Sequence, residues 1–386
     1  MTKAEVAPGP PSRAAFPLLV WAHFLNDGSV NYVPAILPVL MAAHHFPLAL
    51  AGTMVLALQG VTSIFQPLVG VWADRRGGKA FVWTGVGLAA LGGSSIGFAP
   101  SFSVLLGLLV LTGIGNTLFH PQALATASTT TRTRGVRLSV FLVGGELGRG
   151  LWPLLMSVIV MGLGLRGLGL IILPTIVTLP FLARALPGLP PSHRDAAPLH
   201  LSGNLRKMAS IVAFQGLRAA ATFGLLTFVP LLWHSRGGSL VGGASLLSAL
   251  LVVGIAGNLA GGWIADRIGR TAPLVVSSLV GAVCLGLFLH ATGIWNWVTM
   301  GLTGIALFSS NPVAMLISQD AFPGNRSMAS GLALGSGNAV GAFVAFGLGP
   351  VAARFGLGPT LWILVVALVL SAPMALLLPR RPDIPA

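Results

Sequence analysis

Long apolar segments separated by short polar turns run through almost the whole chain. Each segment holds about 20 apolar residues, which is the length an α-helix needs to cross the hydrocarbon core of a bilayer. The pattern predicts an all-α integral membrane protein with twelve transmembrane helices. The expected spans lie near 16–42, 48–73, 80–98, 102–126, 138–162, 166–186, 207–233, 240–265, 272–290, 294–318, 327–351 and 358–379.

The least apolar stretch, at 187–206, divides these spans into two sets of six. It contains four prolines, and its polar, proline-rich composition favours an extended linker over a folded domain. We therefore expect two six-helix bundles joined by a loop. The expected parts are an N-terminal tail at 1–15, an N-terminal bundle at 16–186, a linker at 187–206, a C-terminal bundle at 207–380 and a C-terminal tail at 381–386.

Three short motifs recur in the second half at an offset of 191 or 192 positions, about half the length of the 386-residue chain. Recurrence at half the length predicts a duplicated fold with pseudo-symmetric bundles and a substrate site between them. The pairs are Gly70-Val-Trp-Ala-Asp74-Arg75 with Gly262-Trp-Ile-Ala-Asp266-Arg267, Phe119-His120-Pro121 with Ser310-Asn311-Pro312, and Gly145-Glu146 with Gly337-Asn338.

The Gly-x-x-x-Asp-Arg motif closes an apolar segment in each half and is interpreted as a gating motif. Its glycine lets neighbouring helices approach, and its Asp and Arg can bond helix ends and partner charges in one access state and release them in the other. The alternative is a polar turn that only marks the interface. The motif resembles the signature of the major facilitator superfamily, except that Gly77-Gly78 stands before Lys79 where the family usually has one glycine.

Charged residues are scarce and unevenly placed. They make up 8% of the chain against 54% hydrophobic residues, and the mean hydropathy is +0.88. Of the 22 Lys and Arg residues, seventeen fall on the expected side of both termini, three on the opposite side and two inside spans. This asymmetry predicts a multi-pass protein of the bacterial cytoplasmic (inner) membrane with both termini cytoplasmic. It also explains the net charge of +14 without a nucleic-acid partner.

Four ionisable residues fall inside spans: Asp27, Glu146, Arg149 and Arg218. A charge at the centre of a bilayer costs about 2.5–3.5 kcal/mol on insertion scales, so it persists only with a partner or a role. Because the four formal charges sum to zero, we expect one compensated cluster around a wet cavity. Structural ion pairs that lock helices together are the alternative.

Proton coupling is assigned first to Asp27. Burial raises the pKa of a carboxyl group and a nearby arginine lowers it, and Asp27 has no arginine within a helical turn in sequence. His23 lies one turn earlier on the same helix face, and Glu146 is the second candidate. The residues expected to line the substrate cavity are Arg149, Arg218, His120, Asn31, Asn116, Gln122, Asn311 and Asn338.

Three histidines could have either a functional or a purely structural role. His120 either binds substrate or stands before a proline that merely kinks its span. His44 and His45 form an apparent metal pair, but no carboxylate or cysteine lies near them in sequence, so we interpret them as solvated loop residues. The single Cys284 excludes an internal disulfide and a cysteine-based zinc site. No metal site is predicted.

A narrower resemblance rests on four segments of the first half together with Ser330-Gly331. The four are His23-Phe-Leu-Asn26-Asp27, Gln66-Pro67-Leu-Val-Gly70, Phe119-His120-Pro121 and Ser139-Val-Phe141-Leu-Val-Gly144-Gly145. Together they resemble the fosmidomycin-resistance branch of drug-efflux facilitators, which implies proton-driven export. The chain departs from that branch at Gln122, Glu146 and Trp152-Pro153, as if one carboxylate had moved from span four to span five.

These observations predict a secondary active transporter: a proton-coupled antiporter that exports a small drug or metabolite, anionic compounds included, by alternating access. A proton-coupled uptake symporter for a small organic anion is the alternative, since the fold does not fix direction. We expect no enzyme activity and no cofactor, with the proton gradient as the energy source. The expected partners are a small-molecule substrate and the lipid bilayer, and the expected functional unit is a monomer.

Overall fold

The computed structural model describes residues 14–76, 78–127, 134–186, 205–321 and 326–379, and these contain helices but no strand. Residues 187–204 of the expected linker and most of both tails lie outside the described residues, while 205–206, also expected in the linker, begin helix α9. The helices of the first half are α1 (Ala15–Asn31), η1 (Val33–Ile36), α2 (Leu37–His44), η2 (Leu48–Leu50), α3 (Ala51–Val55), η3 (Leu56–Gly60), α4 (Val61–Arg76), α5 (Ala80–Ser95), η4 (Ile96–Phe98), α6 (Phe102–Ala127), α7 (Arg134–Leu163), η5 (Leu165–Ile171) and α8 (Ile172–Ala185).

The second half begins with a helix that follows the expected linker. Its elements are α9 (Leu205–Ser235), α10 (Leu240–Ser248), η6 (Ala249–Val253), α11 (Gly254–Ile268), α12 (Thr271–His290), α13 (Trp295–Ala321), α14 (Arg326–Phe355) and α15 (Leu357–Leu376). The short π-helical turn η3 interrupts the second span of the first half, and η6 interrupts its counterpart in the second half.

Eleven helical stretches of the described residues are long and apolar enough to cross a membrane. The remaining expected span is the first, which the structure builds from α1, η1 and α2 in succession. Pro34 and Pro38 fall inside this stretch, and proline lacks the N–H that an uninterrupted helix would need there. The twelve predicted spans are therefore all helical, and the first is interrupted in its C-terminal part.

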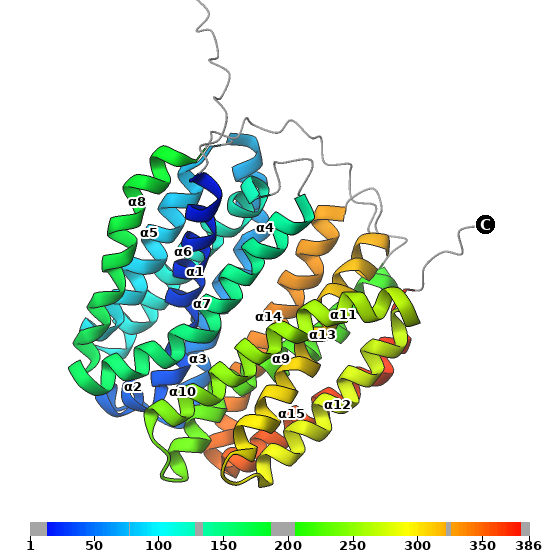
Figure 1. Cartoon of the computed structure of the whole chain (residues 1–386). Coiled ribbons are helices and arrows are strands. Elements are labelled where there is room, and N and C mark those ends of the chain that lie inside the picture. Colours follow the sequence, from blue (N-terminus) through cyan, green and yellow to red (C-terminus); the bar gives the residue numbers. More distant parts are fainter. Residues whose placement is uncertain (1–13, 77, 128–133, 187–204, 322–325, 380–386) are drawn as a thin grey trace, which may run out of the picture.

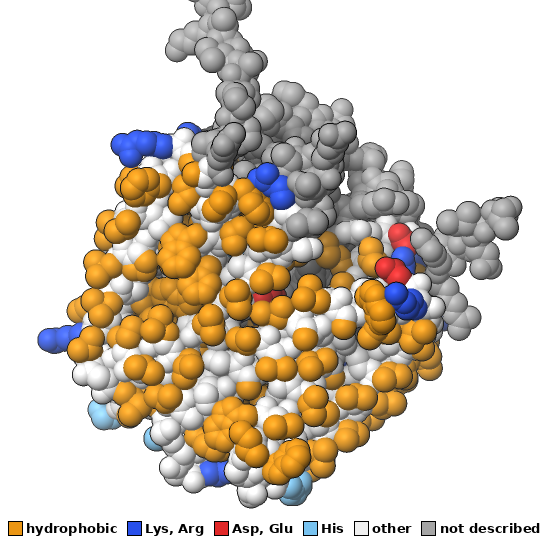
Figure 2. All heavy atoms as spheres, viewed as in Figure 1, with side chains coloured by type: hydrophobic (Ala, Val, Ile, Leu, Met, Phe, Trp, Pro, Cys, Tyr) orange, Lys and Arg blue, Asp and Glu red, His pale blue; other side chains and the backbone are white. Residues whose placement is uncertain are grey.

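Equivalent helices pack against each other in both halves, which confirms the duplicated architecture. In the first half α1 packs on α7 and α5 on α6, while in the second half α9 packs on α14 and α12 on α13. Figure 1 shows the two helix groups side by side, with the start of α1 and the end of α15 directed toward the same side of the molecule. In Figure 2 hydrophobic side chains dominate the outer surface and charged ones lie mostly at its margins, as a lipid-facing surface requires.

The two bundles meet closely at the end opposite the start of α1, which we call the far face. Glycines make this contact possible, because a side chain at each would collide with the partner bundle. A Cβ atom on Gly52 would lie 2.2 Å from the carbonyl oxygen of Ala345, and one on Gly349 would lie 2.2 Å from that of Ala49. The bundles also contact each other through α7, which packs on α10 and η6 of the second half. The bundles are thus sealed together at the far face.

Candidate functional site

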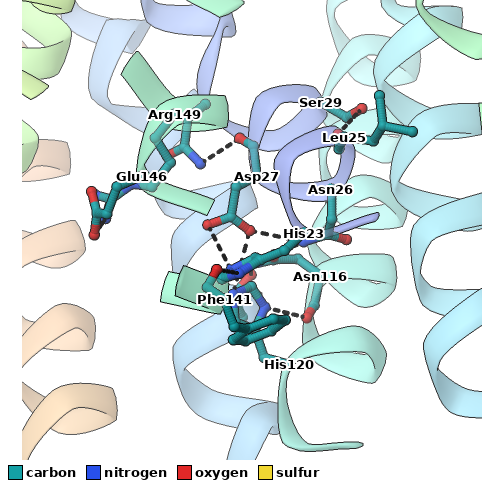
Figure 3. A network of polar contacts seen from close by, with 12 residues as sticks. His23, Leu25, Asn26, Asp27, Ser29, Asn116, His120, Phe141, Glu146 and Arg149 are labelled. Atoms are coloured by element: carbon teal, nitrogen blue, oxygen red, sulfur yellow. Dashed lines mark hydrogen bonds and ion pairs between the residues drawn. The ribbon is translucent and has the colours of Figure 1, made fainter. Parts of the chain in front are cut away.

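A compact group of ionisable side chains lies in the first half, on α1 and α6. His23 Nε2 lies 3.4 Å from Asp27 Oδ2, and His120 Nε2 lies 3.3 Å from Asp27 Oδ1. Figure 3 shows the three side chains pointing toward one another. We call His23, Asp27 and His120 the acid–histidine cluster. The sequence indicated the first pair through its spacing of four, but only the fold brings His120 to the same carboxylate.

Packing fixes the orientation of His23. Its Nδ1 lies 2.7 Å from the carbonyl oxygen of Phe141, and its ring stacks on the Phe141 ring at 4.1 Å between centroids. The ring occupies space that a side chain at Gly145 would fill, since a Cβ there would lie 2.3 Å from His23 Nε2. Gly145, which has its counterpart in Gly337, therefore makes room for a histidine in the first half.

His120 is held from its own helix. Its Nδ1 lies 3.1 Å from the carbonyl oxygen of Asn116, one turn earlier on α6, which leaves Nε2 directed at Asp27. The side chain of His120 is 27% exposed, against 10% for Asp27 and 4% for His23. Of the three, His120 is therefore the residue most open to the surroundings.

An amide network supports the carboxylate. Asn26 Nδ2 donates to Asp27 Oδ1 at 3.0 Å and to Asn116 Oδ1 at 2.7 Å. Asn116 Nδ2 in turn reaches the Thr62 hydroxyl on α4 at 3.4 Å, and Asn31 donates to the main-chain oxygen of Asp27 at 2.8 Å. The network ties α1, α4 and α6 together around the acid. Neither Asn26 nor Thr62 was predicted as a site residue from the sequence. Asn26 could have been, because it lies directly before Asp27 in the His-x-x-Asn-Asp segment, whereas no motif marks Thr62.

Glu146 and Arg149 form a separate ion pair on α7. Arg149 Nη1 donates to Glu146 Oε1 at 3.1 Å, and both side chains are partly exposed. In Figure 3 Glu146 points away from Asp27. Arg149 is nevertheless close enough to act electrostatically on Asp27 and His120. The fold thus places an arginine near the acid that has none within a turn in sequence.

The expected single cluster of four ionisable residues is wrong, because Glu146 and Arg149 form their own ion pair and Arg218 lies apart from the other three. This residue lies inside the second bundle on α9 and is only 3% exposed. Its guanidinium donates to Ser278 Oγ at 3.0 Å and to the carbonyl oxygens of Ala306 at 2.7 Å and Leu307 at 2.6 Å. A hydroxyl and two main-chain carbonyls, rather than Asp27 or Glu146, therefore bond its Nη atoms, and Nε has no hydrogen-bond partner among the described residues. The position of Arg218 along its span could not reveal which groups its guanidinium bonds.

Three further residues expected in the cavity, Gln122, Asn311 and Asn338, lie on α6, α13 and α14. Gln122 is 3% exposed, and its Oε1 has no hydrogen-bond partner among the described residues. Asn311 is half-buried on α13, and Asn338 is exposed on α14. His44 ends α2, and His45 after it is exposed with a positive φ of 52°.

The gating motifs occupy equivalent places in the two halves. A Cβ on Gly70 would lie 3.9 Å from Pro121, and one on Gly262 would lie 4.0 Å from Pro312, so each glycine faces the proline of the His-Pro or Asn-Pro repeat. The side chains of Asp74 and Arg75 lie outside the described residues. In the second copy Asp266 is exposed, and the Arg267 guanidinium lies 3.6 Å from the centre of the Trp263 ring.

The motif turns also match in backbone geometry. Gly78 and Gly269, which follow α4 and α11, have positive φ values of 103° and 84°. Such values are strained for other residues, so glycine closes the turn in both copies. Beyond the second turn, Arg270 Nη1 bonds Asp320 Oδ2 at 2.7 Å and links the start of α12 to the end of α13.

The comparison with known proteins identifies the class. Residues 19–345 match the family model of the Major Facilitator Superfamily, so the chain belongs to that family of membrane transporters and is not an enzyme. It is 28% identical to the fosmidomycin resistance protein of Escherichia coli (strain K12), over 86% of this chain and 84% of that one. It is 27% identical to the MFS-type transporter YfnC of Bacillus subtilis (strain 168), over 96% of this chain and 94% of that one.

Solved structures support the same fold. A bacterial homologue of the human lysosomal transporter Spinster, in an inward-facing and occupied conformation, superposes with a TM-score of 0.81 at 16% identity, over 95% of this chain and 97% of that one. A point mutant of the nucleoside transporter NupG gives a TM-score of 0.80 at 14% identity, over 94% of this chain and 98% of that one. The predicted fold is confirmed.

Proposed function

We propose that this chain is a proton-coupled antiporter of the bacterial inner membrane, which exports a small drug or metabolite, anionic compounds included. The observation that carries the proposal is the acid–histidine cluster, in which a buried carboxylate meets two imidazoles inside a transporter fold. Ionisable side chains within membrane spans mark ion and substrate pathways, and proton relays are built from such acids and histidines. The resemblance to a fosmidomycin resistance protein favours export of an antimicrobial.

In the proposed cycle Asp27 is the principal proton carrier, and His23 and His120 exchange protons with it. Histidine changes its charge in the physiological range, which suits it to this exchange. His120 has the most exposed side chain of the three, and in this cycle protons reach the cluster through it. The side chains of Glu146 and Arg149 are also partly exposed, and an anionic substrate competes with Glu146 for the arginine.

Alternating access follows from the duplicated fold. The glycine contacts at the far face support a state that is closed on that side and open toward the side of the termini, which we place in the cytoplasm from the distribution of basic residues. Proton release and substrate loading occur in this state. The chain functions as a monomer with the proton gradient as its only energy source.

A sensitivity screen tests the direction of transport. The chain is expressed in a bacterial host that lacks its own exporters, and the cells are exposed to a panel of antimicrobials and organic anions that includes fosmidomycin. We expect raised resistance and lower cellular accumulation of at least one compound, with both effects abolished by an uncoupler. Higher accumulation would instead establish the uptake symporter.

A variant then tests the coupling residue. Purified protein in liposomes is supplied with the compound identified by the screen, and substrate-driven proton movement is followed with a pH-sensitive dye. We expect Asp27→Asn to reduce proton movement at least about tenfold, because an amide cannot carry the proton. Asp320→Asn is the matched control, since it makes the same change in an ion pair at the end of α13. Undiminished coupling in Asp27→Asn would eliminate the assignment.

A further inference from the structure

The hydrogen-bond partners of the two histidines determine which ring nitrogens carry hydrogen. A carbonyl oxygen can only accept a hydrogen bond, so Nδ1 of His23, facing Phe141, and Nδ1 of His120, facing Asn116, must both be N–H groups. In a neutral imidazole the other nitrogen, Nε2, then bears a lone pair. Both Nε2 atoms face an oxygen of the Asp27 carboxylate at 3.3–3.4 Å. Two imidazole lone pairs and a carboxylate therefore face one another, and a positive species between them would stabilise this arrangement.

Protons can fill this requirement, but the geometry also matches a metal ion. The ligand atoms of His23, Asp27 and His120 all lie within 4.8 Å of one another. Tetrahedral zinc binds His nitrogen at about 2.0–2.1 Å and carboxylate oxygen at about 2.0–2.2 Å, which separates neighbouring ligand atoms by about 3.4 Å. His23 Nε2 lies at that distance from Asp27 Oδ2, and His120 Nε2 lies at that distance from Asp27 Oδ1, so the two imidazoles approach the two oxygens of one carboxylate.

We propose that His23, Asp27 and His120 form a binding site for a divalent transition-metal ion of the Zn²⁺ and Co²⁺ type. Imidazole and carboxylate are the ligands that such ions accept in proteins, and three ligands leave one position for water. The ion would approach from the side of His120, the most exposed of the three ligands.

The surroundings of the three ligands match those of established metal sites. A metal-binding histidine almost always donates its second ring N–H to a carbonyl or a carboxylate, and a metal-binding carboxylate is itself hydrogen-bonded. Phe141 and Asn116 supply the carbonyls, and Asn26 donates to Asp27 Oδ1 at 3.0 Å. Arg149 opposes a cation electrostatically, but Glu146 offsets its charge at 3.1 Å. Every ligand is therefore oriented before an ion arrives.

The metal site uses the same residues as the proposed proton coupling, but it can be tested separately. A metal ion and protons would occupy the same lone pairs, so the ion would compete with protons whatever the substrate is. Binding can be measured on purified protein without any transport. Failure of the proposed export would leave the metal site intact, and failure of metal binding would leave the coupling proposal intact.

Co²⁺ titration of the full-length protein, purified in detergent without a histidine tag, tests the proposal. Tetrahedral Co²⁺ absorbs strongly in the visible, and we expect this absorption to saturate at one ion per chain, with Zn²⁺ displacing it. Asp27→Asn and His120→Gln should each weaken Co²⁺ binding at least about tenfold, because each removes a ligand. A His44→Gln/His45→Gln double variant, which changes two histidines at the end of α2, should bind as the unchanged protein does.

A ligand exchange keeps the test decisive if a variant folds poorly. His120→Cys retains a metal ligand, and a thiolate bound to Co²⁺ adds a sulfur-to-cobalt charge-transfer band in the near ultraviolet. Appearance of that band would place the ion beside residue 120. Absence of saturable Co²⁺ binding by the unchanged protein, or binding that Asp27→Asn and His120→Gln leave intact while the His44/His45 variant loses it, would overturn the proposal.

Discussion

Equivalent positions of the two halves hold opposite charges: Asp27 in the first half and Arg218 in the second. These residues are 191 positions apart, the same offset that relates His120 to Asn311. Asp27 meets His23 and His120, whereas Arg218 donates to the carbonyl of Leu307, the counterpart of Asn116 at the same offset. Even His23 has a counterpart in Phe214, whose ring lies 5.6 Å from the Arg218 guanidinium.

The comparison separates two ways of keeping charge inside a membrane protein. The first half surrounds an acid with groups that can exchange a proton, so its charge can change during a cycle. The second half surrounds a guanidinium, which does not deprotonate readily, with main-chain oxygens that cannot titrate. A duplicated fold therefore provides one variable and one fixed electrostatic site. We place proton handling in the first half on this ground.

The largest expected effect on stability comes from the fixed site. Arg218→Gln removes charge-assisted hydrogen bonds to Ser278 and to two carbonyls, and hydrogen bonds to charged groups contribute about 1.5–3 kcal/mol each. We expect the free energy of unfolding in detergent to fall by about 3 kcal/mol, while proton coupling per molecule of folded protein persists. Loss of coupling at unchanged stability would place Arg218 in the transport cycle and break the comparison.

An equivalent glycine in each half offers a sharper test. A Cβ on Gly145 would lie 2.3 Å from His23 Nε2, whereas one on Gly337 would lie 2.6 Å from the Gln215 Cβ. Gly145→Ala and Gly337→Ala should both cost about 1–3 kcal/mol of overpacking. Only Gly145→Ala should also impair substrate-driven proton movement, because it displaces an imidazole of the cluster. Equal impairment by both variants would contradict a functional difference between the halves.

The smallest expected effect concerns the Glu146–Arg149 pair. Both side chains are partly exposed, and exposed ion pairs contribute at most about 1 kcal/mol. We expect Glu146→Gln to change thermal stability little and to alter the apparent affinity for an anionic substrate, with proton movement retained. Loss of coupling as complete as in Asp27→Asn would transfer the carrier role to Glu146.

The sequence predicts the site residues better than it predicts their partners. Spacing by four pointed to His23 and Asp27, and spacing by three pointed to Glu146 and Arg149, because one helical turn brings such residues together. The contact between Asp27 and His120 joins residues 93 positions apart, on helices whose rotation about their own axes is set by packing. Arg218 was misplaced for the same reason, since its partners are carbonyl groups that every residue has.

By itself the sequence determined the class of fold, the repeat and the places where charge enters the membrane. These properties depend on hydrophobic length and on periodicity, which a linear pattern contains. Only the tertiary structure decided that the charges form a cluster, an ion pair and an isolated arginine. Those contacts depend on helix rotation and on glycine-sized gaps such as that at Gly145, which are fixed when distant helices pack together.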